Sequence, residues 1–294
     1  MMKKWMALVN RDAGRAPVDL DVVVAALAAA GVEADVETPA SREETVHLID
    51  RGAGEGRTYY AVVGGDGTVN LAANALLAHS GLDPVLGVLP AGTGCDLLRT
   101  FGISQDLGEA ARHLATKDTY PIDVVTLEGS WGTRYFVNVA QVGVGAAAAE
   151  TAPRLRRGLG QLRYPLAFLA RLPRFPVTTV RVVSEKRTYE SEALAVIIAN
   201  AQFFAGGWNV APRATLVDGV ADIQIINTRK TRAPALVPKI IKGTHLADRA
   251  VRRFSAAEFD ITTDVAWPLE ADGDYIGNTP VSGRVVSAAL RLKI

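Results

Sequence analysis

The sequence predicts an α/β domain built on a parallel sheet, followed by a β-sandwich domain. In the first 120 residues, short apolar segments alternate with segments of helical periodicity, and beyond them strand-like segments follow one another, separated by Pro, Gly and Asn. Strands that alternate with helices are typical of a parallel sheet covered on both faces, whereas a series of strands is typical of a sandwich. We therefore expect a first domain over residues 1–122 and a sandwich over 123–283, with the tail 284–294 packing back on the first domain.

The expected elements follow from the apolar segments and from the residues that end them. Strands of the first domain are predicted over residues 5–9, 32–36, 59–63 and 84–89. A helix is predicted over 18–30, which Gly31 ends, and another over 71–78. Ser41 can cap a further helix, with Glu43 and Glu44 in its first turn. Strands of the second domain are predicted over 124–127, 135–139, 177–183, 193–199, 221–226, 259–263 and 284–292.

Composition describes an ordinary folded protein. Of the 294 residues 49% are hydrophobic and 21% charged, and the net charge of +1 gives no general attraction to nucleic acid. The single cysteine, Cys95, excludes an internal disulfide framework and a multi-cysteine zinc site, which fits a cytoplasmic protein. Signal-peptide and membrane-spanning segments are not expected, because every apolar run is too short.

The segment from Gly64 to Asn70 is the first candidate site. An apolar strand runs into Gly-Gly-Asp-Gly-Thr, and an Ala-rich helical pattern follows. Glycines allow unusual φ values and close approach to a ligand, and a helix start supplies N–H groups that suit a phosphate. A tight turn without a ligand is the alternative, since the segment is neither a Walker loop nor the Gly-x-Gly-x-x-Gly of dinucleotide folds.

A second Gly-rich turn, Ala91-Gly92-Thr93-Gly94, strengthens the phosphate interpretation. Both turns follow predicted strands, and ligands of parallel sheets bind at the carboxyl ends of strands. Asp66 and Asp96 are then the natural carboxylates for Mg²⁺, which takes one or two of them together with phosphate oxygens. For Asp96 the alternative is a carboxylate that only stabilises a helix N-terminus.

Together these motifs resemble the diacylglycerol kinase catalytic family, which includes the sphingosine kinases. Gly64 to Asn70 matches its first signature, which NAD kinases share, and Leu89 to Ile103 matches its more specific second signature. Further matches follow in the family's order along the whole chain. They are Asn10-Arg11-Asp12-Ala13-Gly14, Thr38, Phe136-Val137-Asn138-Val139 with Gly143, the segment from Pro212 to Asp222, and Asp272-Gly273-Asp274.

The resemblance implies a Rossmann-like nucleotide domain of the NAD kinase and diacylglycerol kinase type, with the sandwich receiving the lipid. It implies an enzyme that transfers the γ-phosphate of ATP to a lipid hydroxyl, with diacylglycerol as the expected substrate and Mg²⁺ as cofactor. The ATP-binding residues would be Asn10, Arg11, Asp12, Ala13, Gly14, Thr38, Gly64, Gly65, Asp66, Gly67, Thr68, Val69, Asn70 and Thr93.

The resemblance also implies roles for acidic residues. The catalytic group would be Asp274, Asp272 and Asp66, with the base at Asp274 and Asp66 as the alternative base. By spacing alone, an ordinary Asp-Gly turn between two strands is the alternative for Asp272 and Asp274. In bacterial relatives a second Mg²⁺ site would use the Asp218 side chain with the carbonyls of Thr215 and Val220, where a plain β-turn is the alternative.

The chain departs from the family's pattern at several positions. Leu71 replaces an acidic residue, Cys95 replaces Asn or Ser, Arg11 replaces Pro, and Asp274 replaces a glutamate that is one methylene longer. Two alternatives to a lipid kinase therefore stay open, an NAD kinase-like enzyme and a nucleotide-binding regulator with impaired catalysis.

Two segments rich in Lys and Arg indicate what kind of partner the protein binds. Residues 154–174 hold six arginines without an acidic residue, interleaved with leucines at helical spacing, and residues 229–253 hold a second cluster of Lys and Arg. Such a segment can lie on an anionic membrane, so we expect peripheral contact with a lipid surface rather than nucleic acid. The alternative is a core-packing helix with a solvated basic face. The sequence leaves open whether the chain is a monomer or a homodimer.

Overall fold

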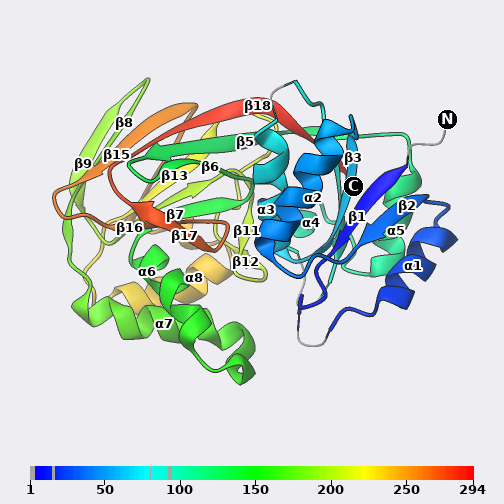
Figure 1. Ribbon diagram of the computed structural model, residues 1–294. Coiled ribbons are helices and arrows are strands. Elements are labelled where there is room, and N and C mark those ends of the chain that lie inside the picture. The colour runs from blue at the N-terminus through cyan, green and yellow to red at the C-terminus, as the bar shows by residue number, and fades with distance from the viewer. Residues whose placement is uncertain (1–3, 15–16, 80, 92–94) are drawn as a thin grey trace. The chain divides into compact units, whose positions relative to one another are not determined.

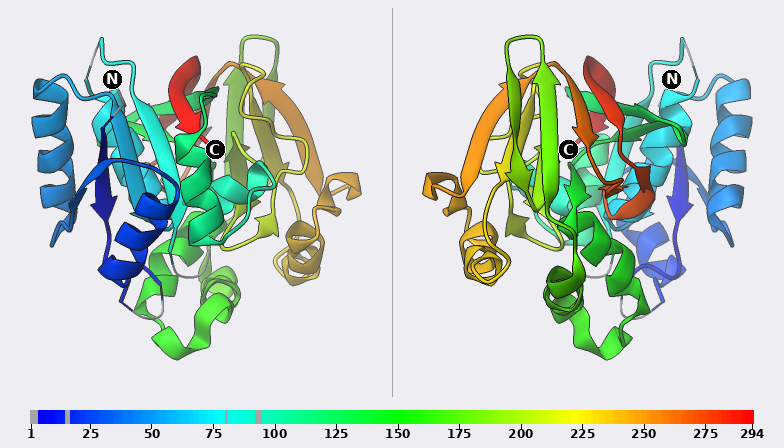
Figure 2. Two further views of the ribbon diagram at one scale, coloured as in Figure 1. Left: turned by 90° about the vertical axis from the view of Figure 1, so that its right-hand side faces the viewer. Right: turned by 90° about the vertical axis from the view of Figure 1, so that its left-hand side faces the viewer.

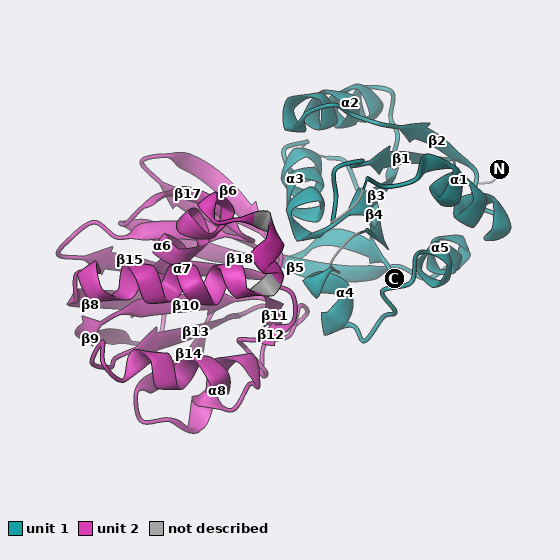
Figure 3. Cartoon of the chain, turned by 90° about the horizontal axis from the view of Figure 1, so that it is seen from below, with its two compact units in different colours: residues 1–123, 287–294 teal, residues 124–286 magenta. Residues whose placement is uncertain are grey.

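The computed structural model describes residues 4–14, 17–79, 81–91 and 95–294 (Figure 1). The chain divides into two compact units, which Figure 3 colours teal and magenta. Unit 1 comprises residues 1–123 and 287–294, and unit 2 comprises residues 124–286.

Unit 1 is built on a parallel sheet with the strand order β2-β1-β3-β4. Its strands are β1 (Trp5–Val9), β2 (Ala34–Glu37), β3 (Tyr59–Gly64) and β4 (Val85–Pro90). Residues 291–293, at the end of β18 (Val281–Lys293), pair with β4 in parallel. All carboxyl ends of β1 to β4 therefore lie at the same edge of the sheet, which is the edge where such sheets bind ligands.

Helices cover both faces of this sheet, and Figure 2 shows the blue and cyan strands lying between them. They are α1 (Leu20–Ala29), α2 (Arg42–Gly54), α3 (Asp66–Leu77), α4 (Asp96–Thr100) and α5 (Leu107–Ala115). Trp5, Ala7 and Val9 pack with residues of α1 and α5, whereas Met6 lies beside α2. Side chains alternate between the faces of a strand, and both faces are buried here, which explains why β1 is apolar throughout.

The predicted elements of unit 1 match the structure to within a few residues, with one informative exception. Ser41 caps α2 as predicted, because its Oγ accepts a hydrogen bond from the Glu44 N–H at 3.1 Å. Helix α3, however, begins at Asp66, five residues before the predicted start at residue 71. The segment expected to be a phosphate loop therefore comprises the last residue of β3, the N-cap Gly65 and the first turn of α3.

Unit 2 is a sandwich of antiparallel sheets. One has the order β14-β13-β10-β7-β16-β17, and the other contains residues 281–284 of β18 followed by β15-β8-β9. Two short strands, β11 and β12, pair with each other, and the green hairpin of β8 and β9 is clear in Figure 2. The strands are β5 (Tyr120–Gly129), β6 (Gly132–Phe136), β7 (Val139–Gly143), β8 (Thr178–Ser184), β9 (Thr188–Ala193), β10 (Ala195–Ala199), β11 (Phe203–Phe204), β12 (Trp208–Asn209), β13 (Ala221–Ile226), β14 (Val251–Ala256), β15 (Glu258–Thr263), β16 (Pro268–Ala271) and β17 (Asp274–Asn278).

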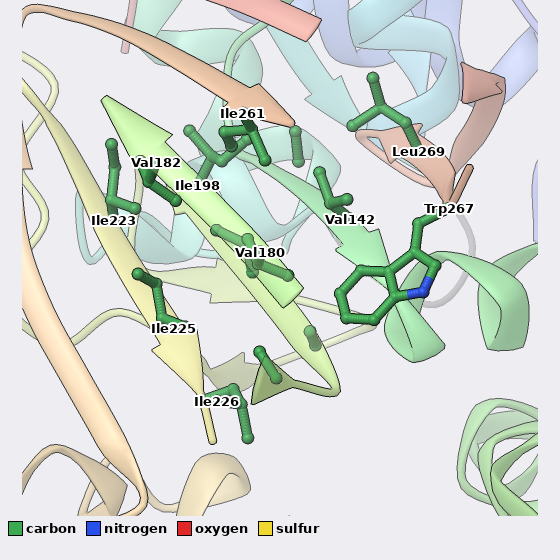
Figure 4. Packing of buried hydrophobic residues seen from close by; sticks show 14 of the residues in the cluster. Val142, Val180, Val182, Ile198, Ile223, Ile225, Ile226, Ile261, Trp267 and Leu269 are labelled. Carbon is green, nitrogen blue, oxygen red and sulfur yellow. The ribbon is translucent and has the colours of Figure 1, made fainter. Parts of the chain in front are cut away.

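The core of unit 2 lies between its sheets. Val142 and Ile198 of one sheet meet Val180 and Ile261 of the other, and the fully buried Trp267 closes one end (Figure 4). Burial of such side chains stabilises the unit by roughly 1.5–3 kcal/mol each. This packing confirms the predicted fold class, an α/β domain followed by a β-sandwich.

Helices lie against the outer face of the sheet that contains β7 and β16, in the lower part of Figure 1. They are α6 (Val144–Thr151), α7 (Arg163–Arg171) and α8 (Val237–Ile241), with 3₁₀ turns at Ala152–Arg154, Arg157–Leu162, Leu172–Arg174, Ala233–Leu236 and His245–Ala247. The strand predicted over 135–139 is wrong, because the chain leaves β6 after Phe136 and enters β7 at Val139. The backbone N–H groups at this break bind a side chain that is distant in sequence, as described below.

Candidate functional site

The first Gly-rich turn joins β3 to α3 through close packing. A Cβ on Gly64 would lie 2.6 Å from the Thr68 Cβ, so only glycine leaves room for the Thr68 side chain. None of Gly64, Gly65 and Gly67, all in the described part, has a φ in the left-handed region, and Gly65 has a φ of −102°. The expectation that these glycines adopt unusual φ values is therefore wrong, and close approach is the reason for Gly64.

Asn10 ties the end of β1 to this turn. Its Nδ2 donates a hydrogen bond to Thr68 Oγ1 at 3.0 Å, and its Oδ1 accepts one from the Asp12 N–H at 3.1 Å. The Asn10 N–H itself bonds the Val63 carbonyl of β3. The loop after β1 is thus fixed against the first turn of α3.

A polar cavity of about 830 Å³ opens at this edge of the unit 1 sheet. Its volume lies within the ~300–1,000 Å³ typical of small-molecule sites. The cavity brings together most of the predicted ATP-binding residues, namely Asn10, Arg11, Asp12, Ala13, Gly14, Thr38, Gly65, Gly67 and Thr68.

Other members of the predicted set do not line this cavity. Val69 and Asn70 are buried inside α3, and Gly64 and Asp66 are absent from the lining of the cavity. Thr93 and its neighbours Gly92 and Gly94 lie outside the described residues.

Sequence reasoning missed Arg42, Ser41 and Thr45, which also line the cavity. They belong to the first turn of α2 or cap it, directly after β2. The signal was present, since a capped helix start that follows a parallel strand presents N–H groups at the ligand edge. Among the described residues, Arg42 and Arg11 bring guanidinium groups to the lining of this cavity.

Asp66 joins the two signature segments. Its Oδ1 accepts hydrogen bonds from the Asp96 N–H at 2.8 Å and the Leu97 N–H at 3.4 Å, at the start of α4. The Cys95 thiol lies 3.4 Å from the same oxygen. Burial raises the pKa of that thiol well above its usual value, and the nearby Asp66 charge raises it further. Cys95 is therefore a protonated donor to Asp66.

Asp96 is buried next to Asp66 and forms an ion pair with Arg99, whose Nε lies 3.3 Å from its Oδ1. The Asp66 carboxylate thus adjoins the backbone of Asp96 at the start of α4, while the Asp96 carboxylate faces Arg99. Two carboxylates beside the Gly-rich turn are of the kind that Mg²⁺ takes as ligands, with phosphate oxygens and waters supplying the rest. Within the described residues, no group of three or more His, Cys, Asp or Glu side chains forms a complete metal site.

In unit 2, Asp272 and Asp274 flank the turn from β16 to β17, and they differ in their surroundings. The buried Asp272 carboxylate accepts hydrogen bonds from three consecutive N–H groups, those of Val137, Asn138 and Val139, at 2.8–2.9 Å. These are the groups at the break between β6 and β7. Asp274 is half-buried and begins β17.

A buried glutamate that sequence reasoning missed supports the same turn. Glu270 is fully buried, and its oxygens accept hydrogen bonds from Gln141 Nε2 at 3.0 Å and the Gly273 N–H at 2.8 Å. Burial raises the pKa of Glu270 well above its usual value, and the charges of Asp272 and Asp274 raise it further.

Strand alternation was the available signal for Glu270. The neighbouring Leu269 and Ala271 face the core, so Glu270 must face the helices on the other side of the sheet. Gln141 is placed in the same way between Ala140 and Val142.

An apolar cavity of about 60 Å³ lies between that sheet face and the helices. Tyr164 of α7 lines it, and its hydroxyl donates a hydrogen bond to Gln141 Oε1 at 3.2 Å. The Tyr164 ring also packs edge-on against Phe204 and Trp208. The remaining lining residues are Gln141, Val144, Gly145, Phe168, Leu194, Ala195, Ile197, Val210, Ile226, Ala233, Leu236, Val237 and Ile240.

The segment predicted as a second Mg²⁺ site is an exposed turn before β13. Asp218 Oδ1 accepts a hydrogen bond from the Val220 N–H at 3.3 Å, and Thr215 Oγ1 accepts one from the Val217 N–H at 3.4 Å. The three predicted residues, Thr215, Asp218 and Val220, lie in this one turn. Its hydrogen bonds are those of the plain turn that was the alternative.

Comparison with known proteins decides the family. Residues 4–127 match the diacylglycerol kinase catalytic domain, and residues 138–294 match the YegS C-terminal NAD kinase beta sandwich-like domain. The chain belongs to the diacylglycerol kinase and YegS family of lipid kinases. It is therefore a member of a phosphotransferase family, and the predicted resemblance is confirmed.

Named relatives and solved structures agree with this assignment. A diacylglycerol kinase of Mycobacterium tuberculosis is 31% identical over 84% of this chain and 80% of its own length. A diacylglycerol kinase of Bacillus subtilis is 27% identical over 95% of this chain and 92% of its own. A crystal structure of a Bacillus anthracis diacylglycerol kinase shares the fold with a TM-score of 0.76 at 21% identity, covering 99% of this chain and 96% of that one.

Proposed function

We propose that this lipid kinase transfers the γ-phosphate of ATP to the hydroxyl group of diacylglycerol and forms phosphatidic acid. The observation that carries the proposal is the unit 1 cavity, which gathers the first Gly-rich turn and the loops after β1 and β2 around one polar space. Two relatives of similar length are named diacylglycerol kinase, which supports this choice of lipid. The family assignment favours a lipid over NAD as acceptor.

The nucleotide residues act by positioning and charge. Backbone N–H groups in the first turn of α3 hold phosphate oxygens, because the first N–H groups of a helix have no acceptor within the helix. Arg11 and Arg42 supply the positive charge that phosphoryl transfer requires. Asp66 and Asp96 would hold Mg²⁺, which when bound neutralises charge on the β- and γ-phosphates.

We assign the general base to Asp274 rather than Asp272. The Asp272 carboxylate holds three backbone N–H groups, and Glu270 is fully buried. Asp274, at the half-buried start of β17, takes the proton as the lipid oxygen bonds to the γ-phosphorus and ADP leaves.

The apolar cavity beside Tyr164 suits part of an acyl chain of the lipid. Because the substrate is a membrane lipid, the enzyme would work peripherally at the cytoplasmic side of a membrane.

Transfer of labelled phosphate tests this proposal directly. Purified protein with Mg-ATP should label diacylglycerol in mixed micelles, and NAD should stay unlabelled. Asp274→Asn should lower turnover by about 100-fold or more, as expected for loss of a general base. Asp264→Asn, an exposed aspartate of the same unit, should leave turnover unchanged.

Several outcomes would contradict the proposal. Labelled NAD with unlabelled lipid would favour the NAD kinase-like alternative. ATP binding without transfer to any lipid in a panel of diacylglycerol, sphingoid base, polyprenol and phosphatidylglycerol would favour a regulator. Full activity of Asp274→Asn would remove Asp274 as the base while leaving the lipid kinase function in place.

A further inference from the structure

The outer side of α7 carries leucines that are exposed to solvent in unit 2. Leu162, directly before the helix, is 61% exposed, and Leu166 and Leu169 are 42% and 48% exposed. Steps of four and three residues place them on one face of the helix. The alternative interpretation, a leucine stripe packed in the core, is therefore wrong for these three, although Leu172 is buried. Exposed leucines gathered on one helix face are typical of a binding surface.

The inner side of α7 is the side that packs on the rest of unit 2. Tyr164 and Phe168 line the apolar cavity, and Ala167 is fully buried. A helix that packs on a sheet needs one apolar face, and the second apolar face requires a partner outside the unit.

The charge around α7 identifies the kind of partner. Residues 154–177 contain six arginines and no acidic residue. Glu150 of α6 pairs with Arg154 and Arg171, whereas Arg156 and Arg174 are exposed. Lys230 Nζ donates a hydrogen bond to the Pro173 carbonyl at 3.1 Å, which joins the second basic tract to this segment. Apolar residues surrounded by cations are typical of segments that bind anionic membrane surfaces.

A second copy of this chain fits the same surface poorly. In a two-fold dimer each patch meets itself, so the arginines of one copy would face the same arginines of the other. An anionic bilayer offers opposite charge and an apolar interior together. Helix α7 has nine residues, and no helix in the described ranges is long and apolar enough to cross a membrane, so α7 would lie along the surface.

We propose that the outer face of α7, formed by Leu162, Leu166 and Leu169, docks this protein onto an anionic lipid bilayer. The leucines enter the acyl boundary, and Arg156 and Arg174 contact headgroup phosphates. The inference deepens the proposed lipid kinase function, since it names the surface that would meet the substrate's membrane.

Co-sedimentation with vesicles tests the docking face without requiring turnover. The full chain should bind vesicles of phosphatidylglycerol and phosphatidylcholine and bind pure phosphatidylcholine much less. The double variant Leu166→Glu/Leu169→Glu should lower the partition coefficient on anionic vesicles by about tenfold or more. Arg156→Glu/Arg174→Glu should lower it by a similar factor and remove most of its salt dependence. Val265→Glu, an equally exposed apolar residue in another part of unit 2, should bind like the wild type.

The alternatives give distinct results. Equal binding by the wild type and the leucine variant, or no binding of the wild type to anionic vesicles, would overturn the proposal. So would a wild-type dimer in solution that the leucine variant converts to a monomer, because a second copy would then cover the face. Misfolding would be excluded by an unchanged melting temperature in both double variants. The milder variant Leu166→Ser/Leu169→Ser should also show a lowered partition coefficient on anionic vesicles. Because sedimentation does not measure phosphoryl transfer, docking and the proposed kinase activity can fail independently.

Discussion

The Oδ1 atom of Asp66 accepts a hydrogen bond from the backbone N–H of Asp96 at 2.8 Å, across 30 residues of sequence. This bond joins the first turn of α3 to the start of α4, so the two signature segments are one structural unit. A carboxylate at a helix start is favourable by itself, and here it also orders the neighbouring turn.

Replacing Asp66 with alanine should therefore affect both stability and activity. We expect Asp66→Ala to lower the free energy of unfolding by about 1.5–3 kcal/mol, because charged hydrogen bonds to two N–H groups are lost. Turnover should become undetectable, since the carboxylate assigned to Mg²⁺ is absent. Thermal unfolding and phosphate transfer measure the two effects. The control is Asp83→Ala, an exposed surface partner of Arg291, and equal effects of both variants would contradict the prediction.

Arg42 lines the unit 1 cavity and provides a direct test of the nucleotide site. Arg42→Ala should raise the KM for ATP by about tenfold or more, because a charged contact to phosphate is worth about 1.5–3 kcal/mol. Arg51→Ala, on the same helix and absent from the lining of the cavity, should leave the KM unchanged. Titration of ATP in the transfer assay distinguishes them, and an unaltered KM in Arg42→Ala would place the phosphates elsewhere.

A substitution at Gly64 tests why this position requires glycine, whether for close packing or for backbone freedom. Gly64→Ala should destabilise the protein by about 1–3 kcal/mol, because the added methyl group overlaps the Thr68 side chain. Gly54→Ala, in a position of α2 with open space around it, should be neutral or slightly stabilising. Denaturant unfolding of both variants gives the comparison, and a neutral Gly64→Ala would show that Thr68 can shift without cost.

Glu270 should make stability depend on pH. Its pKa is raised in the folded state by burial, so its contribution to stability is fully present below the unfolded pKa and is lost as pH rises toward the folded pKa. Glu270→Gln removes the titrating group, so the melting temperature of the wild type relative to this variant should fall as the pH is raised above about 4.5. A difference that stays constant with pH would contradict the assignment.

The sequence predicted the architecture well where a local pattern determines it. Strand β1 is apolar throughout and Ser41 stands before two glutamates, and both predictions match the structure. The predicted strand over 135–139 failed because a distant carboxylate, Asp272, binds the backbone of residues 137–139 and breaks the strand. Propensity cannot show such a contact.

Only part of the candidate site could be predicted, because local motifs can be found in the sequence and contacts between distant residues cannot. Motif residues such as Asn10 and Thr68 could be found from the resemblance, and the structure brings them together. Glu270 and Gln141 were missed, since polar residues that alternate with apolar ones in a strand are usually exposed. Here helices cover that face of the sheet, so both side chains are buried. The exposure of Leu166 and Leu169 required the structure, because helical spacing fits a buried face and an exposed one equally well.

The division between Asp272 and Asp274 has a consequence for how such an enzyme changes over time. One aspartate holds the backbone in place, and its neighbour two positions along carries the proposed chemistry. Substitution at position 274 leaves the anchor at 272 intact, so catalytic strength can vary between descendants without loss of the fold. An engineer who wants a faster or slower variant should begin at position 274 with Asp274→Glu and leave position 272 unaltered.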